Sequence, residues 1–115
     1  MSELARLREE LRLFARERDW EQFHSPKNLA SALAVEAGEL LEPFQWLTEE
    51  QSHSLPDAQA EAVRKELADV LIYLVRLADT LNVDLMKAVR EKIVENASRY
   101  PIDKAKGSAK KYTDL

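Results

Sequence analysis

The residues best suited to chemistry are two acid-x-x-acid pairs, Glu36-x-x-Glu39 and Glu66-x-x-Asp69. Each pair lies in a stretch made mostly of Leu, Ala, Val and Ile. Acidic side chains are rarely buried unless they are paired or bind a metal. If the two stretches are helices that pack antiparallel, four carboxylates converge, repel one another and raise their own pKa values. Because a hard divalent cation with oxygen ligands relieves this repulsion, the sequence predicts a divalent-metal site; the alternative is two solvated helix faces.

A rival metal motif occurs twice, as Glu21-x-x-His24 and Glu50-x-x-His53. Di-iron helical bundles use Glu-x-x-His in the middle of helices, where both side chains point inward. Here both copies lie just before a proline that is expected to open a helix. We therefore do not expect a di-iron site, and we interpret His53 as a loop histidine.

The elements that must position the acid pairs are all expected to be helices. Apolar residues recur at helical spacing in four segments, and only two glycines interrupt the chain. Ser2, Ser25 (before Pro26) and Asp84 are suitable N-caps, whereas Pro43 should kink or end the second helix early. The expected helices are 2–18, 26–47, 57–81 and 85–98, with a polar turn at 48–56. The stretch 63–81 is apolar enough to predict a mostly buried helix.

Composition narrows the class of protein. The chain has 115 residues, 17 basic and 21 acidic, for a net charge of −4. This size fits a single domain, 1–115, with a flexible basic tail at 103–115. The acidic balance does not suggest a nucleic-acid partner, which usually requires a basic surface. The lack of cysteine fits the cytoplasm, and no stretch resembles a signal peptide or a membrane span.

Aromatic side chains gather in the connector 19–27, which holds Trp20, Phe23 and His24. They either close the end of the helical bundle or form the wall of a site for a flat ligand, since aromatic rings stack on bases. Tyr73 shares a helical stripe with Glu66 and Asp69. Outside the connector, Trp46 lies seven residues after Glu39, on nearly the same stripe.

A polar stripe is expected on the last helix, where Lys92, Asn96 and Arg99 recur at i, i+4 and i+7. Taken alone, such a stripe is most often a solvated face.

These motifs together carry a family resemblance. The chain resembles the MazG-type all-α nucleoside triphosphate pyrophosphohydrolases, and more narrowly their dCTP pyrophosphatase branch. The acid pairs are specific to the superfamily, and the Trp and Tyr positions to the branch. The shared stretches cover nearly the whole chain: 18–24, 26–28, 35–46, 66–75, 99–101 and 110–115.

The resemblance implies an all-α, four-helix-bundle subunit and a homotetramer built as a dimer of dimers, with the site at a subunit interface. It implies cleavage between the α and β phosphates that depends on Mg²⁺ or Mn²⁺ and yields a monophosphate and pyrophosphate. The implied metal-binding and catalytic residues are Glu36, Glu39, Glu66 and Asp69. Those implied to bind substrate are Trp20, Phe23, His24, Trp46 and Tyr73 at the base and sugar, and Lys27, Lys92, Asn96 and Arg99 at the phosphates.

The expected substrate is dCTP or a modified dCTP, and the expected role is control of the nucleotide pool. One departure from the resemblance is Leu11, where similar sequences carry His, so the contacts to the pyrimidine differ at this position. A MazG-like hydrolase of broader specificity is the nearest alternative. A non-catalytic helical dimerisation module is the alternative from another class.

Overall fold

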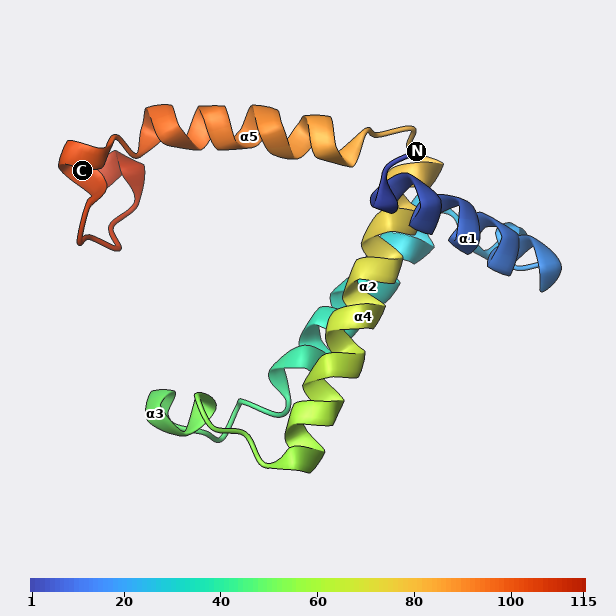
Figure 1. The fold of residues 1–115 in the computed structure, drawn as a ribbon, viewed down its shortest axis with the longest axis horizontal. Coiled ribbons are helices and arrows are strands. Elements are labelled where there is room, and N and C mark those ends of the chain that lie inside the picture. Colours follow the sequence, from blue (N-terminus) through green and yellow to red (C-terminus); the bar gives the residue numbers. More distant parts are fainter. The chain divides into compact units, whose positions relative to one another are not determined.

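The computed structural model describes all residues, 1–115, and contains helices without any strand. The predicted all-α class and the four main helices are confirmed; these helices are α1, α2, α4 and α5 (Figure 1). None of the helices is both long and apolar enough to cross a membrane. The chain forms two compact units, Met1–Asn82 and Val83–Leu115. In chain order the elements are α1 (Glu3–Glu17), the 3-10 turn η1 (Glu21–Phe23), α2 (Pro26–Leu41), α3 (Glu49–Ser52), α4 (Asp57–Thr80), α5 (Leu85–Arg99), α6 (Ile102–Ala105) and the 3-10 turn η2 (Tyr112–Asp114).

Side-chain caps set the starts of three helices where the sequence predicted them. The hydroxyl of Ser2 accepts a hydrogen bond from the amide of Ala5, and the carboxylate of Asp84 accepts one from Lys87. Ser25 caps α2 in the same way, with Pro26 at the first helical position. Each cap satisfies an amide that has no partner within the first turn of its helix.

The connection between α2 and α4 differs in part from the prediction. Helix α2 ends at Leu41 instead of residue 47, consistent with the break expected at Pro43, whose ring excludes it from a helix interior. Segment 48–56 is not only a turn, since it contains the one-turn helix α3. A capping box stabilises α3: the side chains of Thr48 and Gln51 each accept a hydrogen bond from the other's backbone amide. Trp46 therefore lies beyond α2, not on the helical stripe of Glu39.

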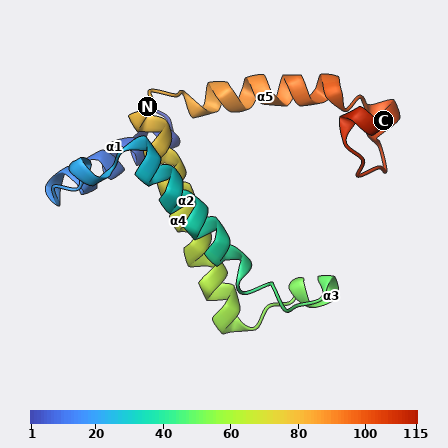
Figure 2. The same ribbon diagram turned by 180° about the vertical axis from the view of Figure 1, so that it is seen from behind.

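Within unit Met1–Asn82, α2 and α4 run side by side in opposite directions, and α1 packs against α4 (Figures 1 and 2). The apolar residues that become fully buried are Ala15 of α1, Leu29 of α2, and Val75 and Ala78 of α4. The core of this unit is thus small and lies where the three helices meet. The antiparallel arrangement brings the C-terminal half of α2 beside the middle of α4, where the acid pairs lie.

The prediction that 63–81 is mostly buried is wrong for the single chain. Leu67 is 54% exposed and Leu71 is 45% exposed, although both lie in the most apolar part of α4. The reason is that α4 packs mainly against α2 and α1 in this unit, which leaves part of its circumference uncovered. Contiguous exposed apolar surface of this kind marks an interaction site in soluble proteins.

A second copy of the chain is the expected cover for this surface. Sedimentation of the wild-type protein is expected to give a dimer or tetramer. Leu71→Glu should shift the mass toward the monomer, because it places a charge on the apolar face of α4. Gln59→Glu, at the exposed start of the same helix, is the matched control and should not change the mass. A fully active wild-type monomer would contradict this expectation.

Unit Val83–Leu115 consists of α5 and a tail that contains α6 and η2. The Arg99 guanidinium lies 4.7 Å from the centre of the Tyr112 ring, and the rings of Tyr100 and Tyr112 meet edge to face at 6.0 Å. Cation–π and aromatic contacts therefore connect the tail to the end of α5. The predicted flexibility of 103–115 stays a prediction.

Candidate functional site

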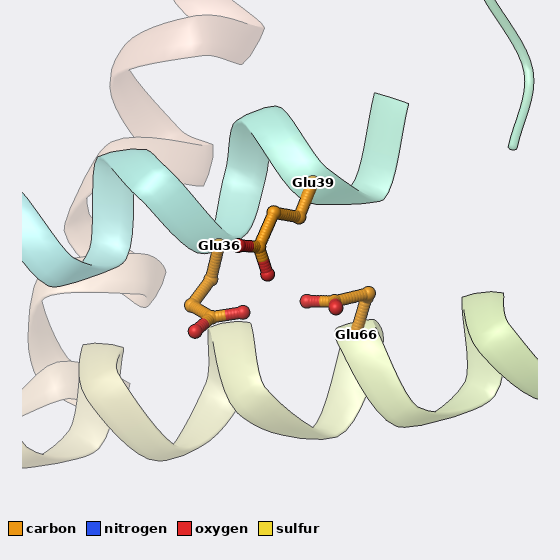
Figure 3. A group of neighbouring side chains, drawn as sticks. All are labelled: Glu36, Glu39 and Glu66. Carbon is orange, nitrogen blue, oxygen red and sulfur yellow. The ribbon is translucent and has the colours of Figure 1, made fainter. Parts of the chain in front are cut away.

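Three carboxylates converge between α2 and α4. Glu36 and Glu39 come from successive turns of α2, and Glu66 comes from α4 (Figure 3). One oxygen from each can be chosen so that all three lie within 4.8 Å of one another, and each residue is partly buried. The sequence predicted this convergence, because acids three residues apart on one helix lie close to the acid of an antiparallel neighbour.

The electrostatics of the cluster are unfavourable without a cation. Burial leaves one oxygen of Glu36 and one of Glu66 (Oε2 in each) without a hydrogen-bond partner. The pKa of Glu36 is raised to about 7, mainly by hydrogen bonding to Glu66, then by burial and by Glu39. Buried polar atoms that lack partners are rare and costly. An all-oxygen donor set with orphaned, partly buried carboxylates fits a hard divalent cation such as Mg²⁺ or Mn²⁺.

This raised pKa predicts how the stability of the metal-free protein depends on pH. Because the folded state binds the Glu36 proton more tightly than the unfolded state, the proton stabilises the fold at low pH. This contribution should be lost as the pH rises from the ordinary value of 4.5 through about 7. The melting temperature in chelator, measured across this range, should therefore contain a falling component that Glu36→Gln removes.

The matched control for this measurement is Glu61→Gln, an exposed acid near the start of α4. It should keep the falling component of the wild-type profile. His24, whose pKa is lowered by burial, makes the folded state more stable as the pH rises. This opposite contribution to the melting temperature should be the same in all three proteins. Parallel profiles for wild type and Glu36→Gln would contradict the raised pKa of Glu36.

Asp69 lies one turn after Glu66 on α4 and is partly buried, but it is outside the group of three converging carboxylates. Tyr73 follows on the same helix and is also partly buried. At 100° per residue, Asp69 and Tyr73 lie within about 60° of Glu66 around the helix axis. The structure thus brings together three of the four predicted acids, and the role of Asp69 as the fourth ligand stays a prediction.

The end of α1 fixes the position of Trp20. Asp19 adopts a left-handed conformation (φ 54°), its amide donates to the carbonyl of Arg16, and the amide of Trp20 donates to that of Ala15. This pair of bonds is a Schellman motif, which turns the chain back over the last turns of the helix. The Trp20 ring consequently packs edge to face on Phe14, with ring centres 5.8 Å apart. The indole is still 44% exposed and can offer the rest of its surface to a ligand.

A buried arginine connects this aromatic corner to α4, and the sequence analysis did not identify it. Arg76 is 7% exposed; its Nη1 lies 3.3 Å from Asp79 Oδ2 and its Nη2 lies 3.3 Å from His24 Nδ1. Asp79 also accepts two hydrogen bonds from the guanidinium of Arg12 on α1, one of them at 2.7 Å. Both arginines lower the pKa of Asp79, Arg12 the more strongly. The available sequence signal was a lone arginine in an apolar run, three residues before an aspartate.

The remaining predicted substrate contacts are exposed within their own units. Phe23 and Lys27 are exposed, and Trp46 is 87% exposed. On α5, Lys92 and Arg99 both pair with Glu95, at 3.2 and 2.7 Å, while Asn96 is exposed. These pairs match the interpretation of the α5 stripe as a solvated face, and phosphate binding by Lys92, Asn96 and Arg99 stays a prediction.

Sequence comparison identifies relatives of this chain. Over 104 residues the chain is 54% identical to dCTP pyrophosphatase 1 of Mus musculus and 50% identical to that of Homo sapiens. In both comparisons the match covers 89% of this chain and 61% of the relative. The chain thus spans about three fifths of the length of these relatives.

Among solved structures, a pyrophosphatase from Archaeoglobus fulgidus superposes with a TM-score of 0.83 at 36% identity. The superposition covers 88% of this chain and 94% of that one. Residues 31–115 match the MazG-like family. Because this match spans most of its length, the chain belongs to the MazG-like family.

Proposed function

We propose that this protein is a nucleoside triphosphate pyrophosphohydrolase whose substrate is dCTP or a modified dCTP. The reaction adds one water across the bond between the α and β phosphates and gives the monophosphate and pyrophosphate. The observation that carries the proposal is the cluster of Glu36, Glu39 and Glu66, with two buried carboxylate oxygens left unpartnered. The likeness to proteins named dCTP pyrophosphatase 1 supports the choice of substrate. Such an activity would limit the pool of normal or modified deoxycytidine triphosphate.

The acid cluster would hold Mg²⁺, or Mn²⁺, through Glu36, Glu39 and Glu66, with Asp69 as the fourth ligand. When bound, the cation supplies neutralisation of the phosphate charge and polarisation of the attacking water, which phosphoryl transfer needs more than covalent catalysis. A carboxylate oxygen that does not bind the cation can accept the water's proton.

The base and sugar are proposed to bind beyond the acids, along α4 toward the aromatic corner. Tyr73 lies two turns after Glu66 on α4, and Trp20 and His24 lie near its C-terminal part, through the contact of His24 with Arg76. Phe23 and Trp46 are proposed to complete the base pocket. Lys27, Lys92, Asn96 and Arg99 are proposed to bind phosphates. We further propose that a homo-oligomer, a dimer of dimers, completes the site.

A broader substrate range is the second candidate, and Leu11 favours it. This partly buried residue on α1 stands where the resemblance leads one to expect a histidine, and its apolar side chain offers a base no hydrogen bond. A site lacking a hydrogen-bonding group discriminates less strongly between bases. The non-catalytic dimerisation module is disfavoured, because solvated acids would not leave carboxylate oxygens buried without partners.

A substrate panel tests the proposal. Each ribo- and deoxyribonucleoside triphosphate is incubated with the protein and Mg²⁺, and pyrophosphate and orthophosphate are measured separately. We expect pyrophosphate as the product, with dCTP or its 5-modified forms giving the highest kcat/KM, and no release in chelator. Mg²⁺ should also raise the melting temperature, as any ligand of the native state does. Orthophosphate as the product, or no turnover of any nucleotide, would contradict the proposed function.

A further inference from the structure

The contact between Arg76 and His24 fixes the state of the histidine ring. Arg76 Nη2 lies 3.3 Å from His24 Nδ1. A guanidinium has only donors, so the imidazole nitrogen that faces it must accept. A neutral imidazole has one accepting and one donating nitrogen, and His24 must therefore carry its proton on Nε2.

Arg76 is itself held firmly enough to impose this state. Its Nη1 bonds to Asp79, and the two hydrogen bonds from Arg12 anchor Asp79 to α1. The side chain of Arg76 is 9% exposed, and its Nε has no hydrogen-bond partner in the chain. A buried arginine kept only to close a structural network would be expected to satisfy every donor. The unpartnered Nε indicates that the network does not account for Arg76 completely.

The position of His24 connects this pair to the proposed pocket. Its ring centre lies 6.3 Å from that of Trp20, with the ring planes at 62°. On α4, Arg76 lies ten residues after Glu66 and within about 80° of it around the axis, about 15 Å farther along the helix. One stripe of α4 thus has the acid cluster at one end and the group of Arg76, His24 and Trp20 at the other, with Tyr73 between them.

We propose that Arg76 is a positioning residue for base recognition, which holds His24 as the neutral Nε2–H tautomer beside Trp20. His24 then donates a hydrogen bond to an acceptor on the edge of a base that stacks on Trp20, such as the O2 or N3 atom of cytosine. This inference rests on the proposed function, since it assigns the base end of the same site. It explains why a charged residue is buried in the apolar part of α4.

The charges around His24 support the neutral form. Protonation of His24 would place a donor against the donors of Arg76, and burial together with the charge of Arg76 lowers the pKa of His24. Glu21 of η1 acts in the opposite direction. Asp79 and Arg12 reach His24 only through Arg76. The donor at Nε2 should therefore persist through the pH range in which an ordinary histidine titrates.

Long-range ¹H–¹⁵N NMR of the imidazole rings tests the tautomer without any substrate. The chain has two histidines, and the exposed His53 is an internal reference. We expect His24 to be the Nε2–H tautomer at pH 7, with a pKa below the ordinary histidine value. In Arg76→Met the tautomers should mix, and the pKa of His24 should rise. A proton on Nδ1, or an unchanged titration in the folded Arg76→Met variant, would overturn the inference.

Binding of dCMP tests the consequence, because this product carries the base without the triphosphate. Arg76→Met and His24→Gln should each weaken dCMP binding about three- to tenfold, as expected for one lost hydrogen bond. The double variant should lose no more than either single variant, because both changes remove the same bond. Asp79 keeps Arg12 as its partner when Arg76 is removed. Arg64→Met, an exposed arginine on α4, is the matched control and should bind normally.

The outcomes separate this inference from the function on which it rests. If wild type releases pyrophosphate from dCTP while Arg76→Met binds dCMP as tightly as wild type, the inference is wrong and the proposed function stands. If Arg76→Met does not fold, the wild-type tautomer and the dCMP affinity of His24→Gln decide the inference. If wild type hydrolyses no nucleotide and does not bind dCMP, both the proposed function and base recognition by His24 are wrong.

Discussion

Replacing any one of the three converging glutamates by glutamine is expected to lower Mg²⁺-dependent release of pyrophosphate at least about 100-fold. Loss of a group that only supports a metal ligand already lowers metal affinity or activity about 10- to 100-fold. The variants are Glu36→Gln, Glu39→Gln and Glu66→Gln. Each removes one negative charge from a cluster whose oxygens lie within 4.8 Å. The metal-free protein should therefore be as stable as wild type or more so, because like-charge repulsion is relieved. Opposite changes in activity and melting temperature would indicate a functional site, not a structural one.

Asp69→Asn decides whether the site has three or four acidic ligands. Asp69 lies outside the converging group, so a three-ligand site predicts that this variant retains most of its Mg²⁺ affinity, whereas a four-ligand site predicts the same loss as for Glu66→Gln. Glu61→Gln is the matched control on the same helix and should retain full activity, since its carboxylate pairs only with Arg64 at the surface. Near-normal turnover in two of the four acidic variants would contradict the predicted metal site.

The sequence predicted those parts of the fold and site that depend on local or periodic signals. The caps Ser25 and Asp84 follow from side chains that bond to amides three residues on, and the end of α2 follows from Pro43. The convergence of Glu36 with Glu66 could be predicted because acids in apolar helices are tolerated only where they are paired or bind a metal together. None of these three features requires knowledge of loop geometry.

The parts that could not be predicted depend on contacts between distant segments. Arg76 and His24 are 52 residues apart, and their contact exists because the Schellman turn after α1 returns the chain toward α4. Periodicity shows that Arg76 lies in an apolar helix, but not which group it meets. The exposure of Leu67 could not be predicted for a related reason. An apolar run indicates that a helix face is buried, but not whether the same chain or a second subunit buries it.

Trp46→Ala is expected to weaken nucleotide binding by about 1–3 kcal/mol, the scale of one base–aromatic stack, without lowering the melting temperature. The indole is 87% exposed, so the fold of the chain gains almost nothing from it. Trp20→Ala should weaken binding to a similar extent and also lower the melting temperature, because it removes the edge-to-face contact with Phe14. The two variants thus distinguish a residue that contributes only to ligand binding from one that also contributes to stability. Binding is measured by calorimetry with dCTP in Ca²⁺, provided that turnover is absent in that metal.

Exposure alone does not distinguish a ligand contact from a subunit contact at Trp46, so the variant must also be examined by sedimentation. If the ring stacks on the base, Trp46→Phe should recover most of the affinity and Trp46→Ala should sediment as wild type does. If it serves only a subunit interface, Trp46→Ala should lower the mass, and its affinity should return to the wild-type value at protein concentrations that restore the oligomer. Unchanged affinity with unchanged mass would exclude Trp46 from both roles. The base site would then depend on Trp20 and His24, whose rings lie close together within a single chain.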